Sequence, residues 1–293
     1  MRSILAVLVF VLFSPAVRAQ EKVKIFDANG VKIAYLDEGT GEAVVLLHGF
    51  SASAGEMWTK MPFAPTQFLP ELAKEYRVIA PDFRGHGKSD KPHDVKQYGR
   101  EMAEDVVRQI DHLKVKKAHV VGYSMGAMIA GKLLVSHPDR LLSVTFGGAA
   151  PLLSQPKESP VLAATVESLE KGKGITPLIV ALTPDGEKGS TAEEAAAFSD
   201  LFLKGKDQKA LAAVLRGFPG LEVTEAKLKA NKVPVQFVYG SRESPFLKDA
   251  IVAARNVLPK AEAVVVEKGD HGSTFTTPEF RKAVLAFLKA NKE

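Results

Sequence analysis

Residues 120–127 (VVGYSMGA) constrain the fold of this chain more than any other stretch. A β-branched run enters a Gly-x-Ser-x-Gly pattern, and a helix-forming segment over residues 127–136 follows at once. A serine at the apex of such a sharp strand-to-helix turn has strained backbone angles, so the residues two before and two after it must be nearly free of side chain. Gly122 and Gly126 meet this need. The pattern predicts a Ser124 hydroxyl raised above the end of a sheet, beside the N-terminal amides of a helix.

Taken by itself, this pentapeptide fits a glycine-rich turn with a surface serine as well as it fits a nucleophile. The choice depends on whether the rest of the chain supplies partners for Ser124. The 293 residues are 46% hydrophobic and 25% charged, which is ordinary globular composition and enough for one large domain. The formal charge is +5, but lysines and glutamates are interspersed without a basic block, so no nucleic-acid partner is expected.

The N-terminal residues differ in kind from the rest. Arg2 is followed by an unbroken apolar run over residues 4–13, and small residues stand at positions 17 and 19. This run is too short to span a bilayer comfortably, so residues 1–19 are predicted to be a signal peptide cleaved near Ala19, with an uncleaved anchor as the alternative. Cleavage would remove Arg2 and Arg18 and lower the formal charge from +5 to +3. Because the chain has no cysteine, it is predicted to be exported without disulfides, to a bacterial periplasm or medium.

Beyond the signal segment, short apolar runs alternate with helical periodicity, which predicts an α/β fold. Asn29-Gly30 between two such runs is typical of a hairpin. Most later runs are apolar throughout, as in parallel strands buried on both faces of a sheet. The expected strands are residues 23–26, 31–36, 43–47, 77–80, 118–121, 141–146, 235–239 and 263–266, and the expected helices are residues 68–75, 98–113, 127–136, 246–258 and 278–289. Residues 152–232 are helix-rich, strand-poor and broken by prolines, so a helical cap is predicted there between core segments 20–151 and 233–293.

A nucleophilic serine needs a base, and the base needs an acid to hold its tautomer. His271 follows the last predicted strand and would project from the sheet edge at which Ser124 lies. The acid should come from the loop after the preceding strand, where Glu243 is the carboxylate at hand. Asp249, one or two helical turns further on, is the runner-up. Asp270 is adjacent to His271, would point the wrong way and is expected to be structural.

Two backbone N–H groups must meet the oxyanion of an acyl-transfer intermediate. Met125 directly follows the serine at the start of a helix and is one candidate. The turn after the strand at residues 43–47 should supply the other, and Phe50 is the predicted donor. His48, in the same turn, is expected to be a structural histidine that fixes the turn and not a base.

Five short motifs occur in one order along the chain and span it from about Val23 to Leu288. They are residues 48–50 (HGF), 82–89 (DFRGHGKS), 122–126 (GYSMG), Tyr239-Gly240 with a carboxylate three beyond the glycine, and 269–271 (GDH). In this set the chain resembles the small capped serine hydrolases of the α/β-hydrolase fold. The resemblance implies a mostly parallel sheet with helices on both faces, a triad of Ser124, His271 and an acid, and an oxyanion hole from the amides of Phe50 and Met125. It also implies that residues 82–89 are structural. Relatives usually carry Asp where Glu243 stands.

The predicted function is hydrolysis of small carboxylic esters through an acyl-enzyme, without metal or organic cofactor. Apolar cap residues are candidates for the substrate pocket, although most of them are expected to be ordinary core residues: Phe198, Leu201, Phe202, Leu215 and Phe218. Lactone hydrolysis, carbon–carbon bond hydrolysis and perhydrolysis use the same serine constellation. A serine nucleophile argues against dehalogenase and epoxide hydrolase chemistry. A non-catalytic binding protein is the rival of another class, but such a protein should have lost Ser124 or His271.

Overall fold

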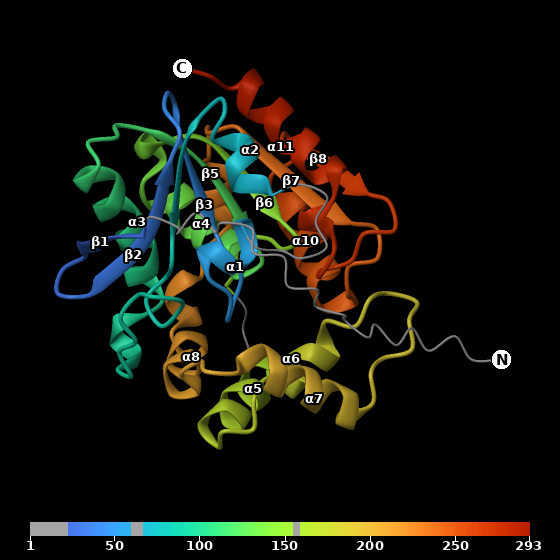
Figure 1. Ribbon diagram of the computed structural model, residues 1–293. Coiled ribbons are helices and arrows are strands. Elements are labelled where there is room, and N and C mark those ends of the chain that lie inside the picture. The colour runs from blue at the N-terminus through green and yellow to red at the C-terminus, as the bar shows by residue number, and fades with distance from the viewer. Residues whose placement is uncertain (1–22, 60–66, 155–158) are drawn as a thin grey trace, which may run out of the picture.

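The computed structural model describes residues 23–59, 67–154 and 159–293 (Figure 1). The predicted signal peptide lies outside the described residues and remains a prediction. An eight-stranded sheet runs through the molecule in the order β1-β2-β4-β3-β5-β6-β7-β8. Its strands are β1 (Lys24–Asp27), β2 (Lys32–Glu38), β3 (Ala43–Leu47), β4 (Arg77–Pro81), β5 (Ala118–Tyr123), β6 (Leu141–Gly147), β7 (Val235–Gly240) and β8 (Glu262–Val266). Strands β3 to β8 are parallel, and β1 and β2 add an antiparallel edge. The predicted fold class and strand positions are confirmed.

The hairpin between β1 and β2 forms at Asn29-Gly30. Both residues have a positive φ, 60° and 86°, as the expected hairpin turn requires. The Asp27 side chain accepts a hydrogen bond from the Gly30 amide at 2.7 Å and closes the turn. Local turn chemistry therefore accounts for the antiparallel edge.

Helices cover both faces of the sheet because neighbouring residues of each strand point to opposite faces. Val45 and Leu47 of β3 belong to a core shared with α3, α4 and α10, whereas Val44 and Leu46 belong to a second core shared with α1, α2 and α11. These helices are α1 (Ala54–Trp58), α2 (Phe68–Leu72), α3 (Arg100–His112), α4 (Met125–Ser136), α10 (Pro245–Val257) and α11 (Pro278–Ala290). A strand apolar at every position is thus buried on both sides, as predicted.

Strand order reverses between β3 and β5, the central pair of the sheet. From β3 the chain crosses to β4 on one side, and from β5 it proceeds through β6 and β7 to β8 on the other. Such a reversal opens a crevice at the carboxyl ends of the two strands, where ligands bind in open α/β sheets. Phe50 and Ser124 follow these two strand ends, so topology alone brings them to one crevice.

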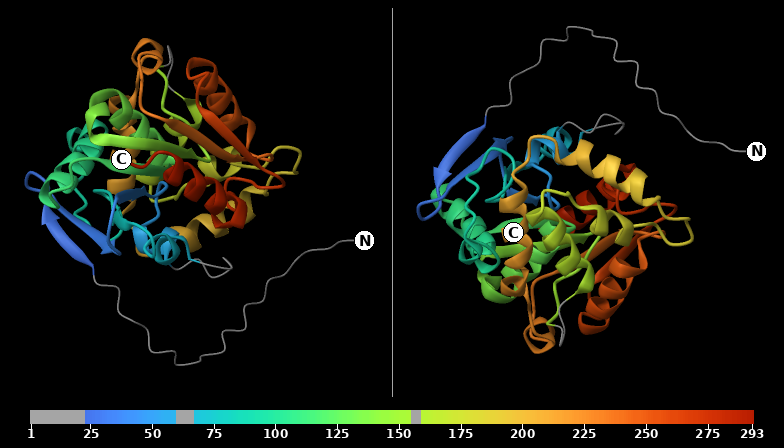
Figure 2. Two further views of the ribbon diagram at one scale, coloured as in Figure 1. Left: turned by 90° about the horizontal axis from the view of Figure 1, so that it is seen from above. Right: turned by 90° about the horizontal axis from the view of Figure 1, so that it is seen from below.

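Residues between β6 and β7 form the inserted helical segment. Its helices are α5 (Pro160–Glu170), α6 (Thr176–Ala181), α7 (Ala192–Leu203), α8 (Gln208–Arg216) and α9 (Glu225–Lys229). Figure 1 shows α5, α6 and α7 beyond the carboxyl edge of the sheet, and the right-hand view of Figure 2, from below, shows them in front of the sheet. At the base of the insertion, a Cβ on Gly99 would lie 2.3 Å from the Gly217 carbonyl oxygen, so backbones of core and insertion touch. The domain boundaries at residues 152 and 232 remain predictions.

None of the helices in the part of the chain described here combines the length and apolar character needed to cross a bilayer.

Candidate active site

Ser124 occupies a strained turn between β5 and α4. Its φ is 54° and its ψ is −119°, a region that side chains rarely adopt. A Cβ on Gly122 would lie 2.2 Å from the Gly126 carbonyl oxygen, and a Cβ on Gly126 would lie 2.2 Å from the Leu47 carbonyl oxygen. Both glycines of the motif are therefore required by backbone contacts, within the turn and against the end of β3. The result is a partly exposed serine at the N-terminus of a helix.

The structure brings Ser124, His271 and Glu243 into one hydrogen-bonded row. His271 Nε2 lies 3.0 Å from Ser124 Oγ, and His271 Nδ1 lies 3.2 Å from Glu243 Oε2. A carboxylate can only accept, so Nδ1–H donates to Glu243 and the lone pair of Nε2 faces the serine hydroxyl. The Glu243 side chain is fully buried, whereas 13% of the His271 side chain is exposed. The arrangement has the donor and acceptor order that a serine nucleophile requires.

The loops that carry Glu243 and His271 are held to each other by backbone contacts. A Cβ on Gly240 would lie 2.1 Å from the Gly269 carbonyl oxygen, so glycine is needed where the loops meet. The Arg242 amide donates to the same oxygen at 2.9 Å. A glutamate side chain, one methylene longer than aspartate, spans the remaining distance to the imidazole.

Tyr123 is a site residue that the sequence analysis missed. Its hydroxyl donates to the backbone carbonyl of His271 at 2.8 Å, and the two ring centroids are 5.4 Å apart. Burial, with the nearby carboxylates of Glu243 and Asp270, raises the pKa of Tyr123 well above its ordinary value. The phenol therefore stays protonated and remains a donor. Its place beside Ser124 in the motif was the only available signal, and sequence spacing does not reveal which carbonyl it reaches.

The two other carboxylates weighed for the acid do not contact the imidazole. Asp249 is exposed on α10. Asp270 Oδ1 accepts from the amides of Gly272 and Ser273 at 3.0 and 2.9 Å, which closes the loop that bears His271. Asp270 is thus structural, as expected.

The amides of Phe50 and Met125 belong to two elements that meet at Ser124. Met125 is the first residue of α4, so its N–H has no partner within the helix. The turn after β3 lies against the serine, because a Cβ on Gly49 would be 3.4 Å from Ser124 Cβ. Within the described residues, the Phe50 N–H donates to no protein acceptor. Two uncommitted amides beside a serine can receive an oxyanion.

His48 and residues 82–89 form a buried support beneath this turn. The Phe83 amide donates to His48 Nε2 at 3.0 Å, and His48 Nδ1 donates to the Gly49 carbonyl at 2.8 Å. Burial lowers the pKa of His48, which keeps the ring neutral and able to accept. Asp82 accepts from the amides of Ala54 and Lys88, each at 2.7 Å. These contacts make His48 a structural histidine, as expected.

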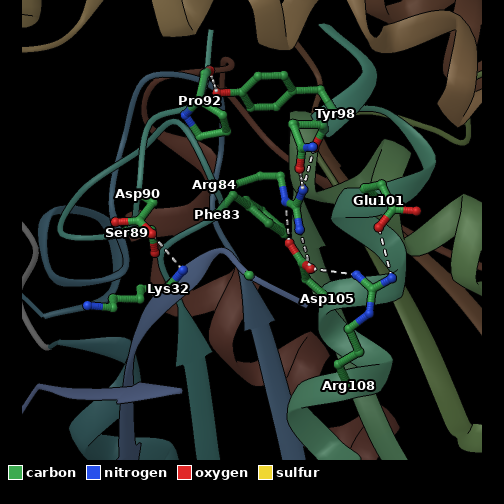
Figure 3. A network of polar contacts seen from close by, with 12 residues as sticks. Lys32, Phe83, Arg84, Ser89, Asp90, Pro92, Tyr98, Glu101, Asp105 and Arg108 are labelled. Carbon is green, nitrogen blue, oxygen red and sulfur yellow. Dashed lines mark hydrogen bonds and ion pairs between the residues drawn. The ribbon is translucent and has the colours of Figure 1, made fainter. Parts of the chain in front are cut away.

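A buried ion pair anchors the same segment to α3 (Figure 3). Arg84 Nε and Nη2 donate to the two carboxylate oxygens of Asp105 at 2.6 and 2.7 Å. Arg108 Nη1 donates to Asp105 at 2.9 Å, so one carboxylate joins two guanidinium groups. Burial raises the pKa of Asp105 in spite of these cations. This network has a structural role, because its hydrogen bonds join residues 82–89 to α3 and none of them involves Ser124.

Two cavities meet at Ser124. The larger has a volume of about 730 Å³ and is lined by His271, Gly49 and the apolar faces of α6 and α7. The smaller has a volume of about 430 Å³ and is lined by Met125, α10 and apolar side chains of α5 and α8. Phe50, Leu178 and Leu182 line both cavities together with Ser124. The serine therefore faces a divided, mostly apolar space of the size that small-molecule ligands occupy.

Four of the five apolar residues proposed for a pocket line these cavities, and Leu201 lines neither. Phe198 and Phe202 line the larger one, and Leu215 and Phe218 line the smaller one. Leu215 and Phe218 are each 4% exposed and belong to the core, but the expectation that most of the five are ordinary core residues was wrong. Phe198 and Phe202 are 54% and 37% exposed. Leu201 is 73% exposed. Helix α7 lies over the site and turns apolar side chains toward the cavity, so burial in a helical core does not account for them.

No group of three or more potential metal ligands is found across residues 23–59, 67–154 and 159–293.

Comparison with known proteins gives one family and several relatives. The family described as "alpha/beta hydrolase fold" matches residues 42–171. The chain is similar to a 2-hydroxymuconate semialdehyde hydrolase from Pseudomonas sp. (strain CF600), with 36% identity over 42% of each chain. Over 90% of each chain it is 27% identical to a 2-hydroxy-6-oxo-6-(2'-aminophenyl)hexa-2,4-dienoic acid hydrolase from Metapseudomonas resinovorans. Among the first curated relatives that it matches, the chain spans less than half of their length.

A solved structure of a thermophilic esterase from Thermogutta terrifontis resembles the whole molecule. The TM-score is 0.74 over 92% of this chain and 98% of the other, at 22% sequence identity. Likeness at that level of identity concerns the fold. The arrangement of sheet and helices described above is therefore the alpha/beta hydrolase fold, and the candidate site lies at the carboxyl ends of its strands.

Proposed function

This chain is an alpha/beta hydrolase by fold, with hydrolases among its relatives, and on that premise we propose that it hydrolyses carboxylic esters through an acyl-enzyme. The observation that carries the proposal is the contact between Ser124 Oγ and His271 Nε2, 3.0 Å long, at the junction of the two cavities. Glu243 completes the triad behind the imidazole. The proposed substrate is a small ester with an apolar acyl group.

In the acylation step, Ser124 Oγ attacks the ester carbonyl carbon while its proton passes to His271 Nε2. The carbonyl π pair moves onto oxygen, and the amides of Phe50 and Met125 stabilise that charge. Collapse of the tetrahedral intermediate breaks the bond to the alkoxy oxygen, which leaves as an alcohol with the proton from His271. Water then attacks the acyl-Ser124 carbonyl with the same base, and the carboxylic acid product leaves.

The proton route supports an orientation for the substrate. Because His271 must protonate the departing oxygen, the alcohol portion should lie in the larger cavity, which His271 lines. The acyl chain would then enter the smaller cavity, on the side of Met125. Apolar side chains from four helices and a short 3-10 turn line that space: Met128, Leu162, Leu215, Phe218 and Phe246.

Charge in the cavities favours neutral esters over the dienoic acids named for one relative. Lys188 is the one Lys or Arg among the described residues that line the two cavities, and it lies on the exposed loop between α6 and α7. A substrate carboxylate in the smaller cavity would have no cationic partner and would face the carboxylate of Asp249 at its edge. Hydrolysis of a carbon–carbon bond in such acids is therefore the second candidate function, supported only by similarity to the two hydrolases named above.

Two further alternatives are less well supported. Epoxide hydrolysis and dehalogenation require a carboxylate nucleophile, whereas the elbow carries Ser124. A ligand-binding protein without activity would have no need to retain Ser124, His271 and Glu243 in a hydrogen-bonded row.

The test is a panel of p-nitrophenyl esters of increasing acyl length, with lactones, a dienoic acid and a perhydrolysis assay alongside, on wild type and Ser124→Ala. We expect hydrolysis of neutral esters that depends on Ser124, with a sharp upper limit on acyl length set by the smaller cavity. If the dienoic acid is turned over faster than the esters, carbon–carbon bond hydrolysis becomes the better assignment. Activity on no member of the panel, with no labelling of wild type by a fluorophosphonate, would contradict both.

A further inference from the structure

Lys206 lies between α7 and α8 and reaches from the inserted segment to the turn that follows β3. Its Nζ donates to the Ser51 carbonyl at 2.6 Å and lies 3.3 Å from the Glu56 carboxylate. It also lies 4.4 Å from the centroid of the Phe202 ring, which lines the larger cavity. One ammonium therefore joins the core turn, helix α1 and the wall of the cavity.

The turn after β3 is strained at Ser51, the residue whose carbonyl Lys206 contacts. Ser51 has a φ of 59°, in the left-handed region that is unfavourable for a non-glycine residue. Ser51 is buried, and its hydroxyl donates to the Phe50 carbonyl at 2.7 Å. The Ala52 amide donates to the Gly49 carbonyl at 3.3 Å. The carbonyls of three successive residues are thus occupied, and the Phe50 N–H is left for a ligand.

We propose that Lys206 is a positioning residue for ester hydrolysis: by holding the Ser51 carbonyl, it fixes the strained turn that aims the Phe50 N–H at the oxyanion. This inference rests on the proposed function and adds a residue to it that neither motif nor family match assigns. Loss of the ammonium would let the 50–51 peptide rotate toward relaxed angles. The amide would then move away from the place where charge develops, while the apolar cavity walls would remain.

Because Lys206 belongs to the inserted segment, the proposed position of the Phe50 amide depends on how that segment packs against the core. The ammonium is carried by the stretch that joins α7 to α8, and the next residue, Asp207, pairs with His93 of the core at 2.9 Å. When α7 lies over the cavity, Lys206 reaches Ser51. A displaced insertion would remove the Lys206 contact from the Ser51 carbonyl.

The experiment compares Lys206→Met, Lys206→Arg and Lys204→Met with wild type on the preferred ester. Lys204 is an exposed lysine two residues away and is the matched control. We expect Lys206→Met to lower kcat by about 10- to 100-fold with KM changed by less than about threefold, because a displaced donor weakens transition-state binding. Lys206→Arg should recover most of the loss, and Lys204→Met should match wild type.

A second measurement separates positioning from a loss of structure. Affinity for a trifluoromethyl ketone, which forms an oxyanion on Ser124, should fall in Lys206→Met by the same factor as kcat. Affinity for the carboxylic acid product should change little, and the melting temperature checks that each variant is folded. Wild-type kcat in Lys206→Met, or a loss confined to KM, would overturn the proposal. If Lys206→Met does not fold, the arginine variant decides by the same ketone-to-product comparison. Absence of Ser124-dependent activity in wild type would instead refute the proposed function.

Discussion

The described residues contain two hydrogen-bonded Ser-His-Glu rows, at the carboxyl and amino ends of the parallel strands. In the candidate active site, His271 lies 3.0 Å from Ser124 and 3.2 Å from Glu243. At the amino edge, His119 Nδ1 lies 2.7 Å from Ser143 Oγ, and its Nε2 lies 3.0 Å from Glu42 Oε2. His119 stands near the start of β5 and Ser124 directly after its end, so one strand contributes to both rows.

The hydrogen-bond distances in the two rows are similar. The rows differ in the backbone conformation of the serine and in whether a substrate can reach it. Ser143 pairs with His119 across neighbouring strands, next to a shift of register between Ala118 and His119, and both residues are 0% exposed. Ser124 sits on a strained turn at the meeting point of two cavities, and its partners come from two other loops. A substrate can reach one hydroxyl and cannot reach the other.

The comparison shows that triad distances alone do not identify a nucleophile. Hydrogen bonds of similar length stabilise the packing at the amino edge, because they give both nitrogens of the buried His119 imidazole a partner. At the carboxyl edge they serve a serine that is exposed to ligand and flanked by two uncommitted amides. The predictions below separate the rows experimentally, from the largest expected effect to the smallest.

Ser124→Ala and Ser143→Ala should have opposite consequences. The first should lower kcat by about 10⁴- to 10⁶-fold and leave the free energy of unfolding within about 0.5 kcal/mol of wild type, because Ser124 is partly exposed. The second should keep kcat within about twofold and lower stability by about 1–3 kcal/mol, since a buried His119 nitrogen loses its partner. Ester turnover and denaturant unfolding measure the pair. Equal kinetic losses in both variants would contradict the distinction.

The carboxylates should divide in the same way. Glu243→Gln should lower kcat by about 10²- to 10⁴-fold, because an amide cannot hold the imidazole tautomer and does not stabilise the imidazolium. Glu42→Gln should leave kcat unchanged and cost about 1 kcal/mol of stability. Asp249→Asn serves as a control, since Asp249 is exposed and does not contact His271. A larger kinetic loss in Asp249→Asn than in Glu243→Gln would show that the acid is misassigned.

The third largest expected effect is that of Lys206→Met, which should lower kcat by about 10- to 100-fold, with Lys206→Arg and Lys204→Met as the comparison variants.

Acid should weaken the fold through the amino-edge row. Burial lowers the pKa of His119, although Glu42 opposes the shift. The unfolded chain then binds the proton more readily than the folded one, so stability is complete above the unfolded histidine pKa of about 6.5 and is lost as pH falls below it. Burial also lowers the pKa values of His48 and His86, which act in the same direction. In His119→Gln, unfolding free energies measured between pH 7 and 5 should therefore depend less steeply on pH, with kcat unchanged at pH 7. An unaltered slope would contradict this.

Features set by local sequence or by strand topology could be predicted, whereas contacts that depend on strand register or on the packing of the insertion could not. Gly122 and Gly126 revealed the elbow because no other residue fits the backbone contacts there. Glu243 and His271 could be chosen because parallel strands end at one edge, which limits the loops that can meet. The row at His119 has no sequence signature, since it depends on which residues of β5 and β6 lie opposite one another. The grip of Lys206 on Ser51, 155 residues away, depends on how the insertion folds back.

The most direct test of the central claim is the site of fluorophosphonate attachment, found by peptide mass spectrometry and followed together with residual ester hydrolysis. The account predicts one phosphonyl group, on the peptide that contains Ser124, with activity lost in proportion to labelling and the Ser143 peptide unmodified. Full hydrolysis by a protein stoichiometrically labelled at Ser124, or attachment at another residue with loss of activity, would contradict it.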